Sequence, residues 1–281
     1  MNIIRKSSIT IQGLKIVYYT VNGQGNPIIF LHGGGVDSAM LSWKEILECW
    51  QSNNRLIAID LPGYGQSDKP DSIEYSTKFY GTIVNEFIEQ LGLTNICLCG
   101  LSMGGGITLY MALHYPQLLS KIVLVAPWGI IKQLPCQRFT AYMVRSTWYQ
   151  KLTFLYKSHW ITQKTLEQTL FGDKKKISTE LVDTISRLYT APKAMIPFAS
   201  FQRSEIHPTY ITSNFTSRLH EIRMPVLFVS GEKDPGVPIK AVIEAAKLLP
   251  DARIEIFEKH KHWPQKENPE RFVKVVNKFI N

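Results

Sequence analysis

Short apolar runs separated by amphipathic segments dominate the hydrophobic pattern of the chain. Residues 6–23 alternate polar and apolar side chains around Gly13, which predicts a β-hairpin. The later apolar runs are interpreted as buried strands, and the continuous run Pro27–His32 is as expected for a strand that is buried on both faces. These runs cover residues 27–32, 55–60, 95–100, 121–126, 224–230 and 252–257. With the hairpin, they predict a sheet of about eight strands.

Helical periodicity appears between these runs. Apolar residues recur at helical spacing from Ser76 to Leu91, and Gly92 follows as a stop signal. A second helix should follow residue 102 and end near Tyr115, since Pro116 comes next. Further helices are predicted over 239–249 and 269–280. Strands that alternate with helices indicate an α/β fold, with a mainly parallel sheet covered by helices on both faces.

Residues 129–220 break this alternation, because they have helical periodicity and little strand character. The segment is rich in aromatic residues, among them Phe139, Tyr142, Trp148, Tyr149, Phe154, Tyr156 and Trp160. We therefore predict a core domain of residues 1–128 and 221–281, with 129–220 inserted after the sixth strand as a helical cap. The cap should cover the carboxyl edge of the sheet, where ligands of open α/β sheets bind. Trp128 and the cap aromatics suggest an apolar pocket there.

The pentapeptide Gly100-Leu-Ser-Met-Gly104 joins an apolar strand to a helix. This G-x-S-x-G pattern is typical of a nucleophile elbow, a strained turn that exposes the serine hydroxyl. A bare G-x-S-x-G also arises in turns whose serine only caps the helix. The strand before it and the helix after it favour the elbow, so Ser102 is the candidate nucleophile.

A serine hydroxyl needs a base to take its proton, and the base needs an orienting acid. In folds with this elbow the chain order is nucleophile, acid, base. Asp234 follows the strand that ends at residue 230 and is the candidate acid, with Glu232 as its rival. After the last strand, His262 is the candidate base because it lies further into the loop than His260.

Acyl transfer also needs N–H donors for the oxyanion. Glycines 33–35 follow a buried strand, and the first choice among them is Gly34, with Gly33 second. The N–H of Met103, at the start of the helix after the serine, should be the second donor. His32 is interpreted as structural, shaping the glycine loop rather than transferring protons.

Composition narrows the class of protein. A chain of 281 residues with 44% hydrophobic and 20% charged residues is ordinary for a globular protein. The start of the chain has no signal-peptide pattern and no run is long enough to span a bilayer, so we expect a cytoplasmic location. The four cysteines show no metal-binding spacing and are expected to be free thiols, with Cys97 and Cys99 buried on one face of a strand.

The formal net charge of +9 is concentrated in the middle of the chain. Residues 130–220 contain 13 Lys and Arg against 5 Asp and Glu, a difference of +8. A basic cap could attract an anionic substrate or an acidic partner, but a set of solvated helix faces is the favoured explanation of the excess. No nucleic-acid-binding motif accompanies the charge, so nucleic acid is not an expected partner.

Five motifs together resemble the α/β-hydrolase fold superfamily over essentially the whole chain. They span residues 31–35, 60–67, 100–105, 231–234 and 262–269. The resemblance implies a Ser102–Asp234–His262 triad and no metal or organic cofactor. In the haloalkane dehalogenase and epoxide hydrolase branches of this superfamily, the resemblance would give an aspartate at the elbow position. The serine found there argues against both branches. The glycine that such enzymes usually have before the base is Lys261 here.

The glycine-rich loop at His32 resembles that of meta-cleavage product hydrolases, which cleave carbon–carbon bonds. Those enzymes usually have asparagine where this chain has Leu101, and Pro-Gly where it has Val36-Asp37. The missing Pro-Gly also weakens a resemblance to prolyl aminopeptidases. The sequence therefore predicts a serine hydrolase of the carboxylesterase type, acting on a small to medium ester. The alternatives are a carbon–carbon bond hydrolase and a ligand-sensing homologue that turns over slowly.

Overall fold

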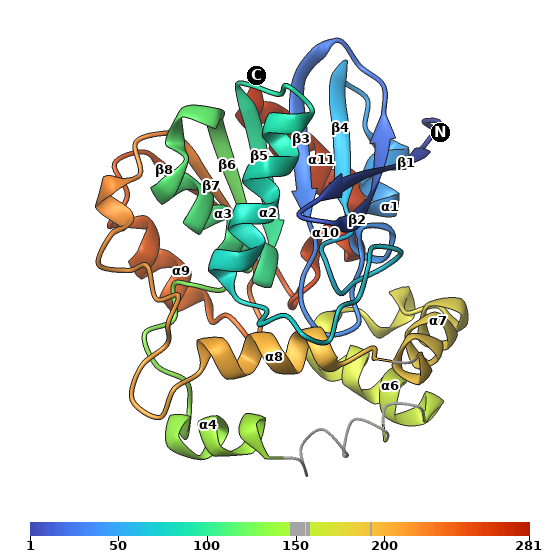
Figure 1. Cartoon of the computed structure of the whole chain (residues 1–281), viewed down its shortest axis with the longest axis vertical. Coiled ribbons are helices and arrows are strands. Elements are labelled where there is room, and N and C mark those ends of the chain that lie inside the picture. Colours follow the sequence, from blue (N-terminus) through green and yellow to red (C-terminus); the bar gives the residue numbers. More distant parts are fainter. Residues whose placement is uncertain (147–154, 156–157, 192) are drawn as a thin grey trace.

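An eight-stranded sheet forms the centre of the computed structural model, which describes residues 1–146, 155, 158–191 and 193–281. The strand order is β1-β2-β4-β3-β5-β6-β7-β8 (Figure 1). β2 pairs antiparallel with β1 and with β4, and all other neighbours are parallel. The strands are β1 (Arg5–Ile11), β2 (Leu14–Val21), β3 (Gly25–Leu31), β4 (Asn54–Ile59), β5 (Ile96–Leu101), β6 (Leu119–Val125), β7 (Val226–Gly231) and β8 (Ala252–Phe257). The predicted mainly parallel sheet of eight strands is confirmed.

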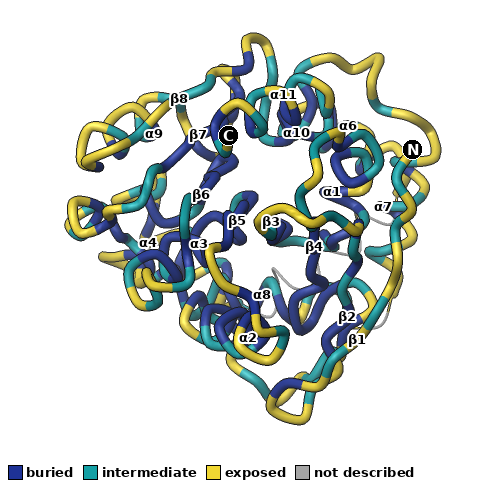
Figure 2. The backbone as a smooth tube through the Cα atoms, turned by 90° about the horizontal axis from the view of Figure 1, so that it is seen from above, coloured by how far each residue is buried: buried dark blue, intermediate teal, exposed yellow. Residues whose placement is uncertain are grey.

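Helices cover both faces of this sheet. One face is covered by α1 (Ala39–Cys49) and α11 (Pro269–Ile280), and the other by α2 (Thr77–Gln90), α3 (Met103–His114) and α9 (Ile239–Ala246). Each layer has its own cluster of buried apolar side chains. Between the layers, β5 and β7 are buried along their whole length (Figure 2). Of these helices, only α1 was not predicted from the sequence; the short helix α10 (Pro264–Glu267), which precedes α11, was not predicted either.

Local capping interactions explain where several helices begin. The hydroxyl of Ser76 accepts a hydrogen bond from the N–H of Phe79 at 3.1 Å, and α2 starts directly after it. The side chain of Asn268 accepts from the N–H of Arg271 at 3.3 Å, and Pro269 occupies the first position of α11. Both are N-cap arrangements that satisfy donors left free at a helix start.

The segment between β6 and β7 is mostly helical and lies across one end of the sheet, below the carboxyl ends of the parallel strands (Figure 1). We call it the cap. Its helical elements are α4 (Gln137–Arg145), α6 (His159–Thr165), the π-helix η3 (Leu166–Leu170), η4 (Lys174–Lys176), α7 (Thr179–Thr190), α8 (Ile196–Glu205) and η5 (Leu219–Glu221). The predicted aromatic residues Trp148, Tyr149, Phe154 and Tyr156 lie outside the described residues.

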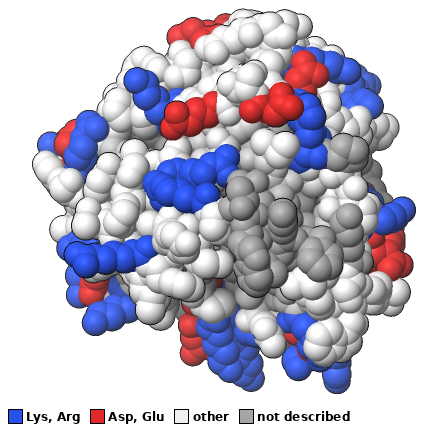
Figure 3. Space-filling model, turned by 60° about the horizontal axis from the view of Figure 1, so that its bottom comes forward, with Lys and Arg blue, Asp and Glu red and all other residues white. Residues whose placement is uncertain are grey.

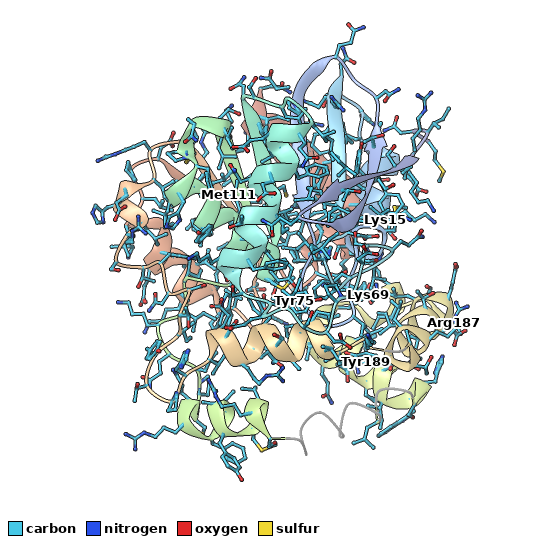
Figure 4. The ribbon with its side chains drawn as sticks, in the orientation of Figure 1. Lys15, Lys69, Tyr75, Met111, Arg187 and Tyr189 are labelled. Atoms are coloured by element: carbon cyan, nitrogen blue, oxygen red, sulfur yellow. The ribbon has the colours of Figure 1, made fainter. Side chains whose placement is uncertain are left out.

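Side chains of α8 contribute to the contact between the cap and the core. The hydroxyl of Ser200 accepts from the N–H of Tyr75 at 3.1 Å, and the hydroxyl of Ser204 donates to the carbonyl of Tyr75 at 2.8 Å. Tyr75 accordingly lies between the core and α8 in Figure 4. These bonds hold α8 against the edge of the sheet at which β5 ends.

Two further expectations concern composition. Cys97 and Cys99 are both buried in the apolar cluster shared with α1 and α11, as predicted from their alternation, and both are free thiols. Among the described residues, no helix combines the length and apolarity needed to span a membrane.

Candidate active site

Ser102 lies in the turn between β5 and α3, in a backbone conformation that non-glycine residues rarely adopt (φ 51°, ψ −112°). Its N–H donates to the carbonyl of Val125 at 2.9 Å, and its carbonyl accepts from the N–H of Trp128 at 2.8 Å. Its side chain does not cap α3. A side chain on Gly104 would lie 2.5 Å from the carbonyl oxygen of Leu31, so the helix can approach the strand only with glycine there. The geometry is therefore that of a strained elbow rather than a helix cap.

Asp234 and His262 meet at the same edge of the sheet. The Nδ1 atom of His262 lies 2.7 Å from Oδ2 of Asp234, whose side chain is fully buried. The other carboxylate oxygen, Oδ1, accepts from the N–H groups of Gly236 at 2.7 Å and Val237 at 3.1 Å. Three donors thus fix the carboxylate, which in turn orients the imidazole. Since Nδ1 is engaged, Nε2 is the ring nitrogen available for proton transfer.

The rival residues lie elsewhere. The carboxylate of Glu232 is exposed and accepts from the N–H of Lys259 at 2.8 Å. The ring of His260 bonds through Nδ1 to the carbonyl of Glu258 at 2.7 Å, and it lines neither of the two cavities next to Ser102. Of the sequence candidates, the structure brings together Ser102 and His262 around common cavities, with Asp234 behind the histidine.

The loop after β3 carries the candidate oxyanion donors. The N–H of Gly33 donates to Oδ2 of Asp37 at 2.7 Å, so this donor is already engaged. The same carboxylate accepts from the hydroxyl of Ser42 at 2.6 Å and the N–H of Ser38 at 2.7 Å, and burial raises its pKa. The N–H of Gly34 donates to no acceptor among the described residues. Gly34 is thereby favoured over Gly33 as an oxyanion donor.

The other candidate donor and the loop histidine occupy fixed positions. Met103 is the first residue of α3, so its N–H has no acceptor within the helix. His32 is buried; its Nδ1 donates to the carbonyl of Gly33 at 2.7 Å, and its Nε2 accepts from the N–H of Leu61 at 3.1 Å. Both ring nitrogens are used in shaping the loop, which fits the structural interpretation of this histidine.

Two cavities adjoin Ser102. The larger has a volume of about 410 Å³ and the smaller about 200 Å³, and both are lined by Ser102, Phe198 and His262. The wall of the larger cavity is mostly apolar, and eight of the 17 residues that line it belong to the cap, among them Tyr189 at the end of α7 (Figure 4). Its cap residues are Thr162, Thr165, Leu166, Thr169, Leu170, Ile185, Tyr189 and Phe198. Enclosure of this size suits a small organic ligand.

The π-helix η3 is bonded directly to the loop that carries His262. The N–H groups of His262 and Trp263 donate to the carbonyls of Thr169 at 3.3 Å and Leu170 at 3.0 Å. The ammonium of Lys261 donates to the carbonyl of Glu167 at 2.6 Å. Lys261, which replaces the usual glycine, therefore ties the loop to the cap. This contact was not predictable from the sequence, because no sequence pattern distinguishes a π-helix from an α-helix.

The positive charge of the cap lies on its outside. Lys and Arg side chains are distributed over the face shown in Figure 3, on which the cap lies, whereas no Lys or Arg among the described residues lines either cavity. The acidic residues that line them are Asp37 and Glu205. The described residues contain no group of three or more His, Cys, Asp or Glu side chains arranged to hold a metal ion. The basic excess therefore offers no counter-charge to an anion bound beside Ser102.

Comparison with known proteins agrees with this architecture. A family model of the alpha/beta hydrolase fold matches residues 26–269. The chain belongs to this alpha/beta hydrolase family. It is 28% identical over 262 residues to 2-hydroxy-6-oxononadienedioate/2-hydroxy-6-oxononatrienedioate hydrolase of Comamonas testosteroni, covering 92% of this chain and 88% of the relative.

Solved structures of other alpha/beta hydrolases have the same fold. A serine hydrolase involved in carbazole degradation, CarC, superposes with a TM-score of 0.82 at 20% identity, covering 99% of both chains. Est816, described as an N-acyl homoserine lactone degrading enzyme, superposes with a TM-score of 0.77 at 22% identity, covering 97% of this chain and all of the other. These structures show that the fold is shared. With the family model that matches it, the chain is a hydrolase of the α/β fold.

Proposed function

We propose that this protein is a serine hydrolase that cleaves small to medium carboxylic esters through an acyl-enzyme on Ser102. The observation that carries the proposal is the 2.7 Å contact between His262 Nδ1 and the buried Asp234 carboxylate, in a histidine that shares both cavities with Ser102. This arrangement leaves Nε2 as the base for the serine hydroxyl.

In the proposed reaction, Ser102 Oγ attacks the ester carbonyl while His262 takes its proton. The N–H groups of Gly34 and Met103 stabilise the negative charge that develops on the carbonyl oxygen. The protonated imidazole, held by Asp234, then gives its proton to the leaving alcohol. Water hydrolyses the acyl-enzyme by the same steps in reverse order, which restores the serine.

A neutral ester fits the cavities better than a carboxylate-bearing substrate. No Lys or Arg among the described residues lines either cavity, so an anionic substrate would lose its hydration without gaining an ion pair. The larger cavity is walled by apolar residues such as Leu41, Leu166 and Ile185, which suit an acyl chain.

The second candidate is carbon–carbon bond hydrolysis, as in the meta-cleavage product hydrolases that the glycine-rich loop resembles. It is favoured by the relative from Comamonas testosteroni, whose name gives its substrates as dioates. The same serine, histidine and aspartate would carry it. Against it stands the observation that no Lys or Arg of the described part of the chain lines either cavity to bind the carboxylates of a dioate.

Hydrolysis of p-nitrophenyl esters from acetate to decanoate, measured for the wild type and Ser102→Ala, tests the proposal. We expect turnover in the wild type and a loss of several orders of magnitude in the variant. Near-wild-type rates in Ser102→Ala would refute the mechanism. A folded wild-type protein that hydrolyses none of these esters but cleaves a vinylogous diketone acid would establish carbon–carbon bond hydrolysis. A protein inactive on both classes would instead be a ligand-sensing homologue.

A further inference from the structure

The smaller cavity beside Ser102 differs in chemistry from the larger one. It has a volume of about 200 Å³ and lies against α8, on the side of Ser102 that faces Trp128 and Val237. Because both cavities contain Ser102 and His262, a substrate held at the serine can place one part in each. The smaller cavity would therefore hold a different part of the substrate from the larger one.

Glu205, on α8, lines this cavity and is only 1% exposed. Its carboxylate accepts two hydrogen bonds from Thr77, one from the backbone N–H at 3.1 Å and one from the side-chain hydroxyl at 2.8 Å. It also accepts from the N–H of Ser213 at 3.0 Å and from Nε1 of Trp128 at 3.4 Å. All four donors are neutral. Among the described residues no Lys, Arg or His pairs with it. Glutamate is rarely this buried without a cationic partner.

A second acceptor lies one helical turn before Glu205. The side-chain oxygen of Gln202 is buried and has no hydrogen-bond partner among the described residues, and Gln202 lines the same cavity. A buried acceptor without a donor is costly, and in a ligand cavity it indicates that a donor is supplied by the ligand. Of the two polar side chains that α8 contributes to this cavity, Glu205 thus has donors but no cationic partner, and the oxygen of Gln202 has no donor among the described residues.

The remaining walls are aromatic. The rings of Phe198 and Phe201 lie nearly parallel, with centroids 6.5 Å apart, and Trp128 meets Phe201 edge-on at 6.4 Å. All three rings line the cavity. Aromatic faces attract cations, and quaternary ammonium groups are bound in proteins by such surroundings. The triad carboxylate of Asp234, behind His262, adds a second negative charge close by.

We propose that this cavity binds a cationic group of the substrate, either an alkylammonium or a quaternary ammonium group. The proposal rests on the proposed ester hydrolysis at Ser102 and specifies its substrate class. Glu205 supplies the charge, the oxygen of Gln202 accepts from an N–H or faces an N-methyl group, and the three rings enclose the cation. The protein would then bind a cation inside a molecule whose own net charge is +9.

Matched ester pairs that differ only in charge test this proposal. Choline and neohexyl esters of the same acid compare the alcohol side, since an N⁺ replaces a carbon in otherwise equal shapes. The p-nitrophenyl esters of trimethylammoniobutyrate and its tert-butyl isostere compare the acyl side. We expect kcat/KM to favour the cationic member of one pair about tenfold, as cation–aromatic and charge contacts in a dry site provide. Equal rates within both pairs would overturn the proposal.

Variants of α8 separate charge from folding, because the ratio within a pair does not depend on the folded fraction. Glu205→Gln should bring the ratio close to one, whereas Gln202→Glu should raise it and Gln202→Lys should lower it. A ratio unchanged in all three would also refute the proposal. Glu167→Gln is the matched control, since Glu167 is a buried cap carboxylate that lines neither cavity.

Calorimetric titration with tetramethylammonium keeps the two proposals distinguishable. If no ester is hydrolysed, ester hydrolysis fails, but binding of this ion to the Ser102→Ala protein that is lost with Glu205→Gln would still support the cation site. Hydrolysis of neutral esters without a cationic preference and without ion binding would retain the enzyme and reject the site.

Discussion

The contact between Gly34 and the cap offers a test of how the oxyanion loop is positioned. A methyl group at residue 34 would lie 2.6 Å from Cδ2 of Phe198 and closer still to Cε2. Ordinary carbon–carbon contacts are about 3.5–4.0 Å, so the overlap is about 1 Å. The Phe198 ring lies nearly parallel to that of Phe201, which limits its retreat in that direction. Gly34→Ala must therefore displace either α8 or the loop.

Overpacking of this kind costs about 1–3 kcal/mol of stability. The effect on kcat should be pronounced even if the protein stays folded, because loss of one oxyanion donor lowers kcat about 10²–10³-fold. We expect Gly34→Ala to lower kcat for p-nitrophenyl acetate about 100-fold with little change in KM. The assay is steady-state hydrolysis, accompanied by urea denaturation to measure the free energy of unfolding.

The double variant Gly34→Ala/Phe198→Leu decides whether the overlap is the cause. Removing part of the ring should relieve the clash, so that the double variant recovers at least tenfold of the activity lost in Gly34→Ala. Phe198→Leu alone serves as the matched control, because Phe198 also lines both cavities. If the two effects simply multiply, the steric reasoning is wrong and the alanine acts through the loop backbone alone.

Two further predictions concern the triad and the core. Asp234→Asn should lower kcat about three to four orders of magnitude, since an amide no longer stabilises the imidazolium, while Glu232→Gln should leave it unchanged; equal losses would reverse the choice of acid. Burial raises the pKa of the Cys97 thiol from 9.0 to about 12. Because the thiol therefore ionises at lower pH in the unfolded chain than in the folded protein, the free energy of unfolding falls as the pH rises from about 9 towards 12. At about pH 10 this loss is about 1.4 kcal/mol, and urea denaturation of Cys97→Ala should show a correspondingly weaker dependence on pH between about 8 and 10. Identical alkaline losses in Cys97→Ala and the wild type would contradict this.

The fold followed from patterns that are local in sequence. The apolar runs favour strands, and β3 to β8 lie where those runs do. The expectation of burial was wrong for β8, because it is an edge strand in which only Phe257 is buried. The last helix begins at Pro269, as predicted, because a capping asparagine and a proline define its start. Helix α1 was missed although Ser38 caps it, since a single amphipathic helix after a glycine-rich loop carries a weak signal.

The sequence was sufficient to identify the candidate residues Ser102, Asp234 and His262, because each follows a strand. Parallel strands bring their carboxyl ends to one edge of the sheet. Chain order then limited the choice of acid and base. The sequence could not determine the preference for Gly34 over Gly33, which depends on a hydrogen bond from Gly33 to a buried carboxylate.

Only the tertiary structure decided what the cap contributes. The sequence showed an excess of Lys and Arg in residues 130–220, and only the fold reveals that none of those described lines a cavity. It also places Glu205 and Gln202 beside Ser102, although about 100 residues separate them in the chain. Charge composition is a sum over residues, whereas the charge that a substrate meets depends on which side chains the packing turns inward.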